Sequence, residues 1–150
     1  MSKRIRVDLD VDMPCRDGVV LRADIFRPDI TSKVPAVICR TPYNKSARKR
    51  DRFFPAVESA AAGFAVVHQD VRGRFASDGE WKPMDWDGGE RSDGLDAVEW
   101  VGQQPWCDGN IGMFGGSYEA GNQLAAAREH PAHLRPPHCP SEQPAPHRGE

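Results

Sequence analysis

The sequence predicts an α/β protein in which an antiparallel hairpin leads into parallel strands, with helices on both faces of the sheet. Three observations support this prediction. Two segments near the N-terminus alternate apolar with polar residues, short apolar runs follow at intervals, and helical segments separate those runs. Strands that alternate with helices along a chain are typical of a parallel sheet that helices cover on both sides.

The first two strands are predicted at residues 5–11 and 19–26, where apolar side chains occupy every second position. A period of two indicates a strand with one buried face. Arg16-Asp17-Gly18 lies between these segments and has the composition of a turn. The two segments therefore predict an antiparallel hairpin closed by a glycine-containing loop.

Three short apolar runs, at residues 34–39, 64–67 and 111–114, predict strands that are buried on both faces. Helices are predicted at residues 53–62, 89–104 and 118–129, and Pro105 ends the second of them. In sheets of this kind the chemistry takes place at the carboxyl ends of the strands.

The composition is that of a soluble globular protein, because 39% of the 150 residues are apolar and 28% are charged. The net charge of −2 gives no electrostatic argument for nucleic acid or an anionic membrane as a partner. The basic run from Lys45 to Arg52, which Asp51 interrupts, is interpreted as a solvated loop or helix start. The charged N-terminus shows no export signal, so a cytoplasmic location with reduced thiols is expected.

The residues Gly115-Gly116-Ser117-Tyr118 lie directly after the third apolar run and directly before a helix. A nucleophile elbow needs this context, because its sharp strand-to-helix turn holds the serine hydroxyl exposed. The amide of the next residue then faces the oxyanion of the reaction, at a helix N-terminus. The general pattern has glycine two positions after the serine, where this chain has Glu119. Two interpretations therefore stay open: Ser117 is a nucleophile, or it is the N-cap of the helix.

Four blocks of sequence extend this motif, in order along roughly residues 11–135: Met13–Leu21, Arg40–Tyr43, Gln69–Glu80 and Gln104–Tyr118. Together they resemble the CocE/NonD hydrolases, the cocaine esterase and X-Pro dipeptidyl-peptidase group (peptidase family S15). The resemblance implies an incomplete α/β-hydrolase fold and a serine hydrolase that cleaves ester or amide bonds through an acyl-enzyme on Ser117. In this family a tyrosine after the first buried parallel strand donates its hydroxyl to the oxyanion hole. Tyr43 stands at the matching position, so it is expected to act together with the backbone N–H of Tyr118.

The resemblance implies no cofactor and no metal, and its substrates are carboxylesters, β-lactam-type acyl groups or X-Pro peptides. It also implies that Asp70, Arg72 and Arg74 form an ion-paired scaffold at the sheet edge rather than acid–base groups. A solvated helix start, rather than a metal cluster, is expected for Asp85, Asp87, Glu90 and Asp93.

The last fifteen residues, 136–150, contain five of the chain's thirteen prolines and few apolar side chains. Such a segment cannot bury enough apolar surface to fold. We therefore expect a catalytic-domain part at residues 1–135, followed by a disordered tail that arose by a frameshift or a truncation.

A serine nucleophile in this fold needs an acid and then a histidine farther along the chain. Glu142 and His147 follow that order but lie in the proline-rich segment. The chain is therefore expected to be an inactive fragment that lacks the triad Asp and His. The alternative is a non-catalytic interaction or scaffold module with the same fold, and the oligomeric state stays open.

Overall fold

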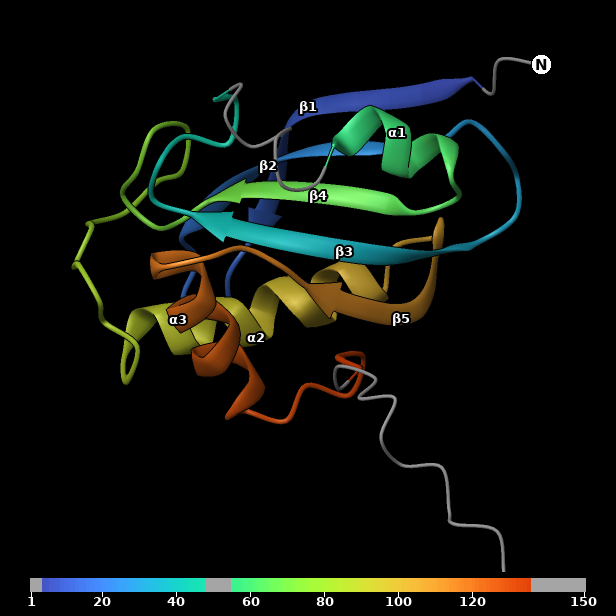
Figure 1. Ribbon diagram of the computed structural model, residues 1–150. Helices are drawn as coiled ribbons and strands as arrows, with labels where there is room; N and C mark the ends of the chain where they lie inside the picture. Colours follow the sequence, from blue (N-terminus) through green and yellow to red (C-terminus); the bar gives the residue numbers. More distant parts are fainter. Residues whose placement is uncertain (1–3, 48–54, 136–150) are drawn as a thin grey trace, which may run out of the picture.

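The computed structural model describes residues 4–47 and 55–135, and at its centre lies a mixed sheet of five strands (Figure 1). The strands are β1 (Ile5–Pro14), β2 (Val20–Pro28), β3 (Val34–Thr41), β4 (Ala65–Asp70) and β5 (Cys107–Met113). The helices are α1 (Ala56–Ala61), α2 (Gly89–Gly102) and α3 (Tyr118–Ala127). The predicted tail at residues 136–150 lies outside the described residues.

The spatial order of the strands is β1-β2-β4-β3-β5. β1 and β2 form the predicted antiparallel hairpin, and β2 also pairs antiparallel with β4. β3 lies between β4 and β5 and is parallel to both, so the prediction of a hairpin followed by parallel strands is confirmed. All six residues of β4 are buried, which explains why the apolar run at 65–67 shows no alternation. The strand continues beyond that run through the buried polar residues His68, Gln69 and Asp70.

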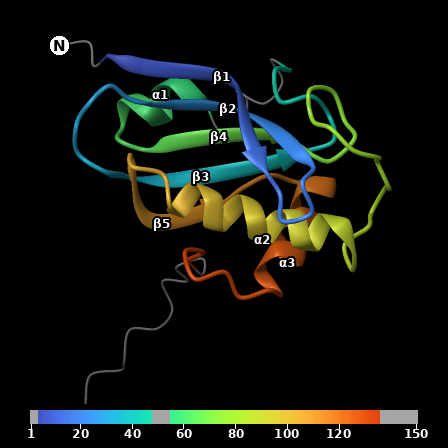
Figure 2. The ribbon, with the colours of Figure 1, turned by 180° about the vertical axis from the view of Figure 1, so that it is seen from behind.

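The hairpin carries an irregularity that bears on the candidate site. Its register shifts between Asp8 and Val11, and Asp10 in this bulge has a φ of 50°. A bulge bends the strand and changes the direction of its side chains. The hairpin turn reaches α2 (Figure 2), where Arg16 Nη2 lies 2.6 Å from Asp96 Oδ1.

Helices cover both faces of the sheet, as predicted: α1 lies on one face, and α2 and α3 lie on the other (Figures 1 and 2). The main core includes Val98 and Val101 of α2, which pack with Ile38 of β3 and Ile111 of β5. Within residues 4–47 and 55–135, no helix has the length and apolar character needed to cross a membrane.

The ends of the helices differ somewhat from the predicted ranges. α2 ends at Gly102 and α3 at Ala127, each two residues before the predicted end. Phe53 and Phe54 of the first predicted helix lie outside the described residues. After α3 the chain returns to the free edge of β5, where Leu134 forms a parallel bridge with Ile111.

Candidate active site

Ser117 occupies the sharp turn between β5 and α3, at the carboxyl-terminal end of the parallel strands (Figure 1). Its backbone has φ 56° and ψ −122°, a region in which a residue with a side chain is strained by about 1–3 kcal/mol. The residue is exposed, and no described residue hydrogen-bonds to its hydroxyl. An N-cap has extended backbone and a side-chain bond to the helix. Ser117 has neither the extended backbone nor the side-chain bond, so the structure does not support the interpretation of Ser117 as an N-cap.

The glycines around Ser117 explain how the turn closes despite Glu119. Gly115 has a φ of +126°, and a Cβ on it would lie 2.5 Å from Cβ of Glu119. The Glu119 side chain therefore occupies the space that Gly115 leaves free. Gly121 likewise leaves space for a neighbouring side chain, because a Cβ there would lie 2.3 Å from the ring of Trp86.

Tyr118 has two distinct parts, a buried side chain and an unused backbone donor. Its hydroxyl donates to Oε1 of Glu90 (3.0 Å) and accepts the backbone N–H of Met84 (2.9 Å). Burial raises the pKa of Tyr118, so the phenol keeps its proton and can donate it. The backbone N–H of Tyr118 takes part in none of the hydrogen bonds between described residues, as is usual in the first turn of a helix. This free donor, directly after Ser117, is suited to bind an oxyanion.

Tyr43 lies in the loop after β3 and is 54% exposed. Its ring meets the ring of Tyr118 edge-on, with centroids 6.3 Å apart. The two residues that the sequence pairs in an oxyanion hole are thus neighbours in space, while their catalytic role stays a prediction. Lys45, two residues later, is buried and ion-paired, so its interpretation as a solvated residue was wrong. Residues 48–52 of the basic run lie outside the described residues.

A network of buried charged side chains contacts Tyr118 through Glu90. Nε of Arg40 donates to Oε1 of Gln69 (3.0 Å), and Nη2 lies 3.3 Å from Oε2 of Glu90. Asp93 accepts two hydrogen bonds from Arg72, at 2.9 and 2.6 Å. The expectation of a solvated helix start is therefore wrong for Glu90 and Asp93, which two arginines pair inside the protein. Burial raises the pKa of Glu90, although the charge of Arg40 opposes this shift.

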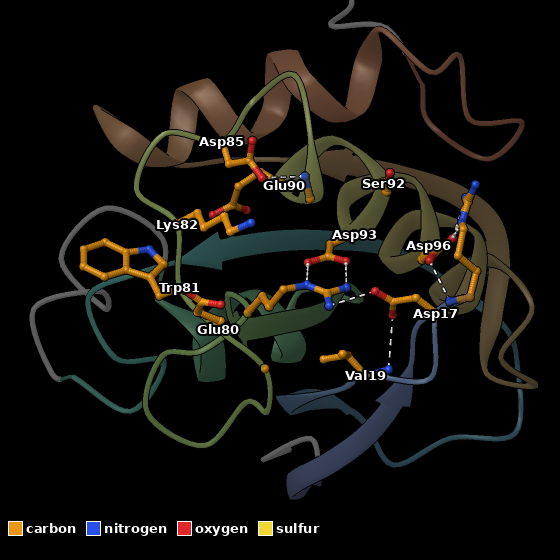
Figure 3. Close-up of a pocket in the computed structure, with 14 residues that line it drawn as sticks. Asp17, Val19, Glu80, Trp81, Lys82, Asp85, Glu90, Ser92, Asp93 and Asp96 are labelled. Carbon is orange, nitrogen blue, oxygen red and sulfur yellow. Dashed lines mark hydrogen bonds and ion pairs between the residues drawn. The ribbon is translucent and has the colours of Figure 1, made fainter.

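A cavity of about 440 Å³ lies beside this network, and Figure 3 shows the side chains around it. Asp93 from α2 and Asp17 from the hairpin turn face each other there, and the guanidinium of Arg72 binds both carboxylates. Ser117 and Tyr43 do not line this cavity. Within the described residues, no group of three or more His, Cys, Asp or Glu side chains could hold a metal ion.

The expected ion-paired scaffold is present for Arg72, whereas Asp70 and Arg74 bind backbone instead. Asp70 accepts the backbone N–H of Lys45 (2.7 Å) and that of Ala76 (3.2 Å). Nε of Arg74 donates to the carbonyl oxygen of Pro42 (3.0 Å), and its guanidinium lies over the ring of Trp81. These two side chains therefore organise the loops at the sheet edge.

Sequence patterns missed Arg40, Lys45 and Asn122 as organising residues. Nδ2 of Asn122 donates to the carbonyl oxygen of Arg40 (2.9 Å), which ties α3 to the end of β3. One signal was available, because an arginine that extends a strand buried on both faces requires carboxylate partners. Asn122, inside an alanine-rich helix, gives no such signal.

Comparison with known proteins supports the relationship that these features indicate. Residues 17–136 match the sequence model of the X-Pro dipeptidyl-peptidase (S15) family. The chain is 43% identical over 125 residues to a cocaine esterase from Rhodococcus sp., covering 79% of this chain and 20% of that protein. It is 32% identical over 143 residues to a putative serine esterase from Mycobacterium bovis, covering 78% of this chain and 22% of that protein.

Solved structures give the same result. A CocE/NonD family hydrolase from Staphylococcus aureus has a TM-score of 0.76 at 28% identity, over 87% of this chain and 26% of that chain. An α-amino acid ester hydrolase has a TM-score of 0.67 at 26% identity, over 83% of this chain and 23% of that chain.

The chain spans about a fifth of the length of the curated relatives that it matches. Because the family model covers well over half of its residues, the chain belongs to the S15 family of X-Pro dipeptidyl-peptidases and CocE-type hydrolases, and its sheet is part of their α/β-hydrolase fold.

Proposed function

We propose that Ser117 is the nucleophile of a serine hydrolase that cleaves carboxylic esters. The observation that carries this proposal is the conformation of Ser117, which is strained, exposed and placed directly before α3. A strained backbone at a residue whose side chain makes no hydrogen bond within the described residues is typical of a functional position. Esters are the favoured substrates because the relatives with the highest identity given above are named esterases.

In the proposed reaction, Oγ of Ser117 attacks the ester carbonyl carbon while a base takes the hydroxyl proton. The carbonyl oxygen becomes an oxyanion, which the N–H of Tyr118 and the hydroxyl of Tyr43 stabilise by hydrogen bonds. The tetrahedral intermediate then collapses, and the alcohol leaves with the proton that the base returns. Water attacks the acyl-enzyme in the same manner and releases the acid.

In this proposal, the histidine that acts as base and the acid that orients it lie outside residues 4–47 and 55–135. Among the described residues, no histidine hydrogen-bonds to Ser117. A serine hydroxyl without a base is a poor nucleophile. The 150-residue chain alone is therefore expected to hydrolyse esters slowly, whereas a longer polypeptide that supplies both groups restores turnover.

A chimera tests this proposal. The matching segment of the Rhodococcus cocaine esterase is replaced by residues 4–135 of this chain, so that the whole hairpin is included. The 43% identity of the two proteins over 125 residues makes the exchange structurally compatible. Hydrolysis of p-nitrophenyl acetate is measured for the chimera, its Ser117→Ala and Tyr43→Phe variants, and a control with Ser92→Ala on the exposed side of α2. Thermal melting followed by circular dichroism verifies that each protein is folded.

The Ser117→Ala variant is expected to lose at least about 1,000-fold in kcat. Tyr43→Phe removes one oxyanion donor and should cost about 100- to 1,000-fold. The Ser92→Ala control should match the unmodified chimera. A folded, active chimera that keeps its activity without the Ser117 hydroxyl would refute the proposal.

A further inference from the structure

The loop that carries Tyr43 is anchored by polar contacts on both sides of that residue. Before it, the carbonyl oxygen of Pro42 accepts a hydrogen bond from Nε of Arg74 (3.0 Å). After it, the backbone N–H of Lys45 donates to Oδ1 of Asp70 (2.7 Å). Tyr43 itself is more than half exposed, so its own burial contributes little to holding the loop.

A further anchor is the side chain of Lys45, which is 5% exposed. Its Nζ lies 2.6 Å from Oδ1 of Asp10 and 2.7 Å from Oδ1 of Asp24. Oγ of Ser46 donates to the second oxygen of Asp24 (3.2 Å), and the backbone N–H of Asp10 donates to the first (3.0 Å). The loop is thereby attached to the bulge of β1 and to β2.

The chemistry of this anchor indicates a geometric role. A buried ion pair adds little net stability compared with apolar side chains of the same volume, because both charges must be desolvated. Hydrogen bonds are directional, however, and three of them, two from Lys45 Nζ and one from Ser46 Oγ, fix one position of the loop against β1 and β2. Burial disfavours the charged form of Lys45, but the hydrogen bonds that its ammonium donates to Asp10 and Asp24 outweigh this effect and raise the pKa of Lys45.

We propose that Lys45 is a positioning residue for Tyr43, which holds the loop so that the tyrosine stays beside Tyr118 and the elbow. The proposal rests on the oxyanion role of Tyr43 given above. Lys45 touches no reacting atom, and it acts through the backbone between itself and Tyr43.

Fluorine NMR can follow this loop directly, because Tyr43 and Tyr118 are the two tyrosines of the chain. The 150-residue protein is labelled with 3-fluorotyrosine, and Tyr43→Phe assigns the two resonances. Lys45→Met removes the ammonium at similar volume. Asp10→Asn is a milder variant that keeps the fold, because the Asp10 side chain is 64% exposed. Asp96→Asn is the matched control, since it weakens a different ion pair, that with Arg16.

In Lys45→Met the Tyr43 resonance should lose most of its displacement from the unfolded value, and in Asp10→Asn it should lose part of it. The Tyr118 resonance should shift far less in both, because the Tyr118 hydroxyl stays bound to Glu90 and Met84 while only the contact with the Tyr43 ring changes. Both resonances should stay in place in Asp96→Asn. An unchanged Tyr43 resonance in every folded variant overturns the proposal.

Kinetics in the chimera separate this inference from the proposed function. If both hold, Lys45→Met lowers kcat more than it changes KM, and it has no further effect in a Tyr43→Phe background. If Tyr43→Phe leaves kcat unchanged, the oxyanion assignment fails. The fluorine resonances then still decide whether Lys45 holds the loop.

Discussion

Replacing Ser117 by glycine is predicted to leave the protein more stable than replacing it by alanine. Alanine keeps the strain of about 1–3 kcal/mol that the backbone at φ 56° imposes on a residue with a Cβ. Glycine adopts this conformation freely, but its more flexible unfolded chain costs about 0.5–1 kcal/mol. The balance favours Ser117→Gly by about 1 kcal/mol, which corresponds to a Tm higher by about 2–4 °C for a domain of this size. Neither variant has the hydroxyl, so the comparison isolates the backbone.

Urea unfolding of the two variants, with equal slopes, gives the difference in the free energy of unfolding. The matched control is Ser92, an exposed residue inside α2. At such a helical position glycine should be less stable than alanine by about 1 kcal/mol, the opposite sign. A Ser117 pair that behaves like the Ser92 pair would show that the turn is unstrained, and the structural basis for the nucleophile would be lost.

Three further predictions concern the buried groups around the elbow. Tyr118→Phe leaves Glu90 and the Met84 N–H without their shared hydrogen-bond partner. The free energy of unfolding, measured in urea, should fall by about 2 kcal/mol, and an unchanged urea midpoint would contradict the observed bonds. Because burial raises the pKa of Glu90 above its ordinary 4.5, its contribution to stability is complete below that pH and is lost as pH rises through the raised pKa. Stability measured over this range should therefore fall more for the wild type than for Glu90→Gln, and parallel curves would refute the assignment. Burial raises the pKa of Cys15 from 9.0 to about 12, so far less of its thiol is ionised at pH 8 in the native protein. Alkylation of Cys15 at pH 8, followed by mass spectrometry, should therefore be roughly 1,000-fold slower in the native than in the urea-unfolded protein. Equal rates would exclude a buried thiol.

Local patterns were sufficient to predict the elements and their order. In β2 the alternate residues Leu21, Ala23 and Ile25 are buried, and the apolar run at 65–67 that begins β4 is buried on both faces, so there the local sequence reports how many faces of a strand are buried. In β1 the same alternation was misleading, because Val7 and Leu9 are exposed. The sharp turn at Ser117 was predictable from the local sequence, because strand, glycines, serine and helix are consecutive. The expected role of Tyr43 came from the family resemblance and stays a prediction, since nothing in its local sequence distinguishes an oxyanion donor from a tyrosine in a turn.

Long-range charge pairing was not predictable from these patterns. Glu90 and Asp93 begin a helix, where acidic residues are normally solvated and favourable. Their burial depends on Arg40 and Arg72, which come from other parts of the chain and neutralise them. Lys45 was misjudged in the same way, because its partners Asp10 and Asp24 are brought to it by the hairpin and its bulge.

Covalent labelling tests Ser117 as the nucleophile most directly. The folded chimera is treated with a fluorophosphonate probe, and the adduct is located by peptide mass spectrometry, with Ser117→Ala as control. The expected result is one adduct on the peptide that contains Ser117, absent in Ser117→Ala, with ester hydrolysis lost in proportion to labelling. An adduct on another residue that accompanies the loss of activity, or undiminished turnover by Ser117→Ala, would contradict the assignment of Ser117.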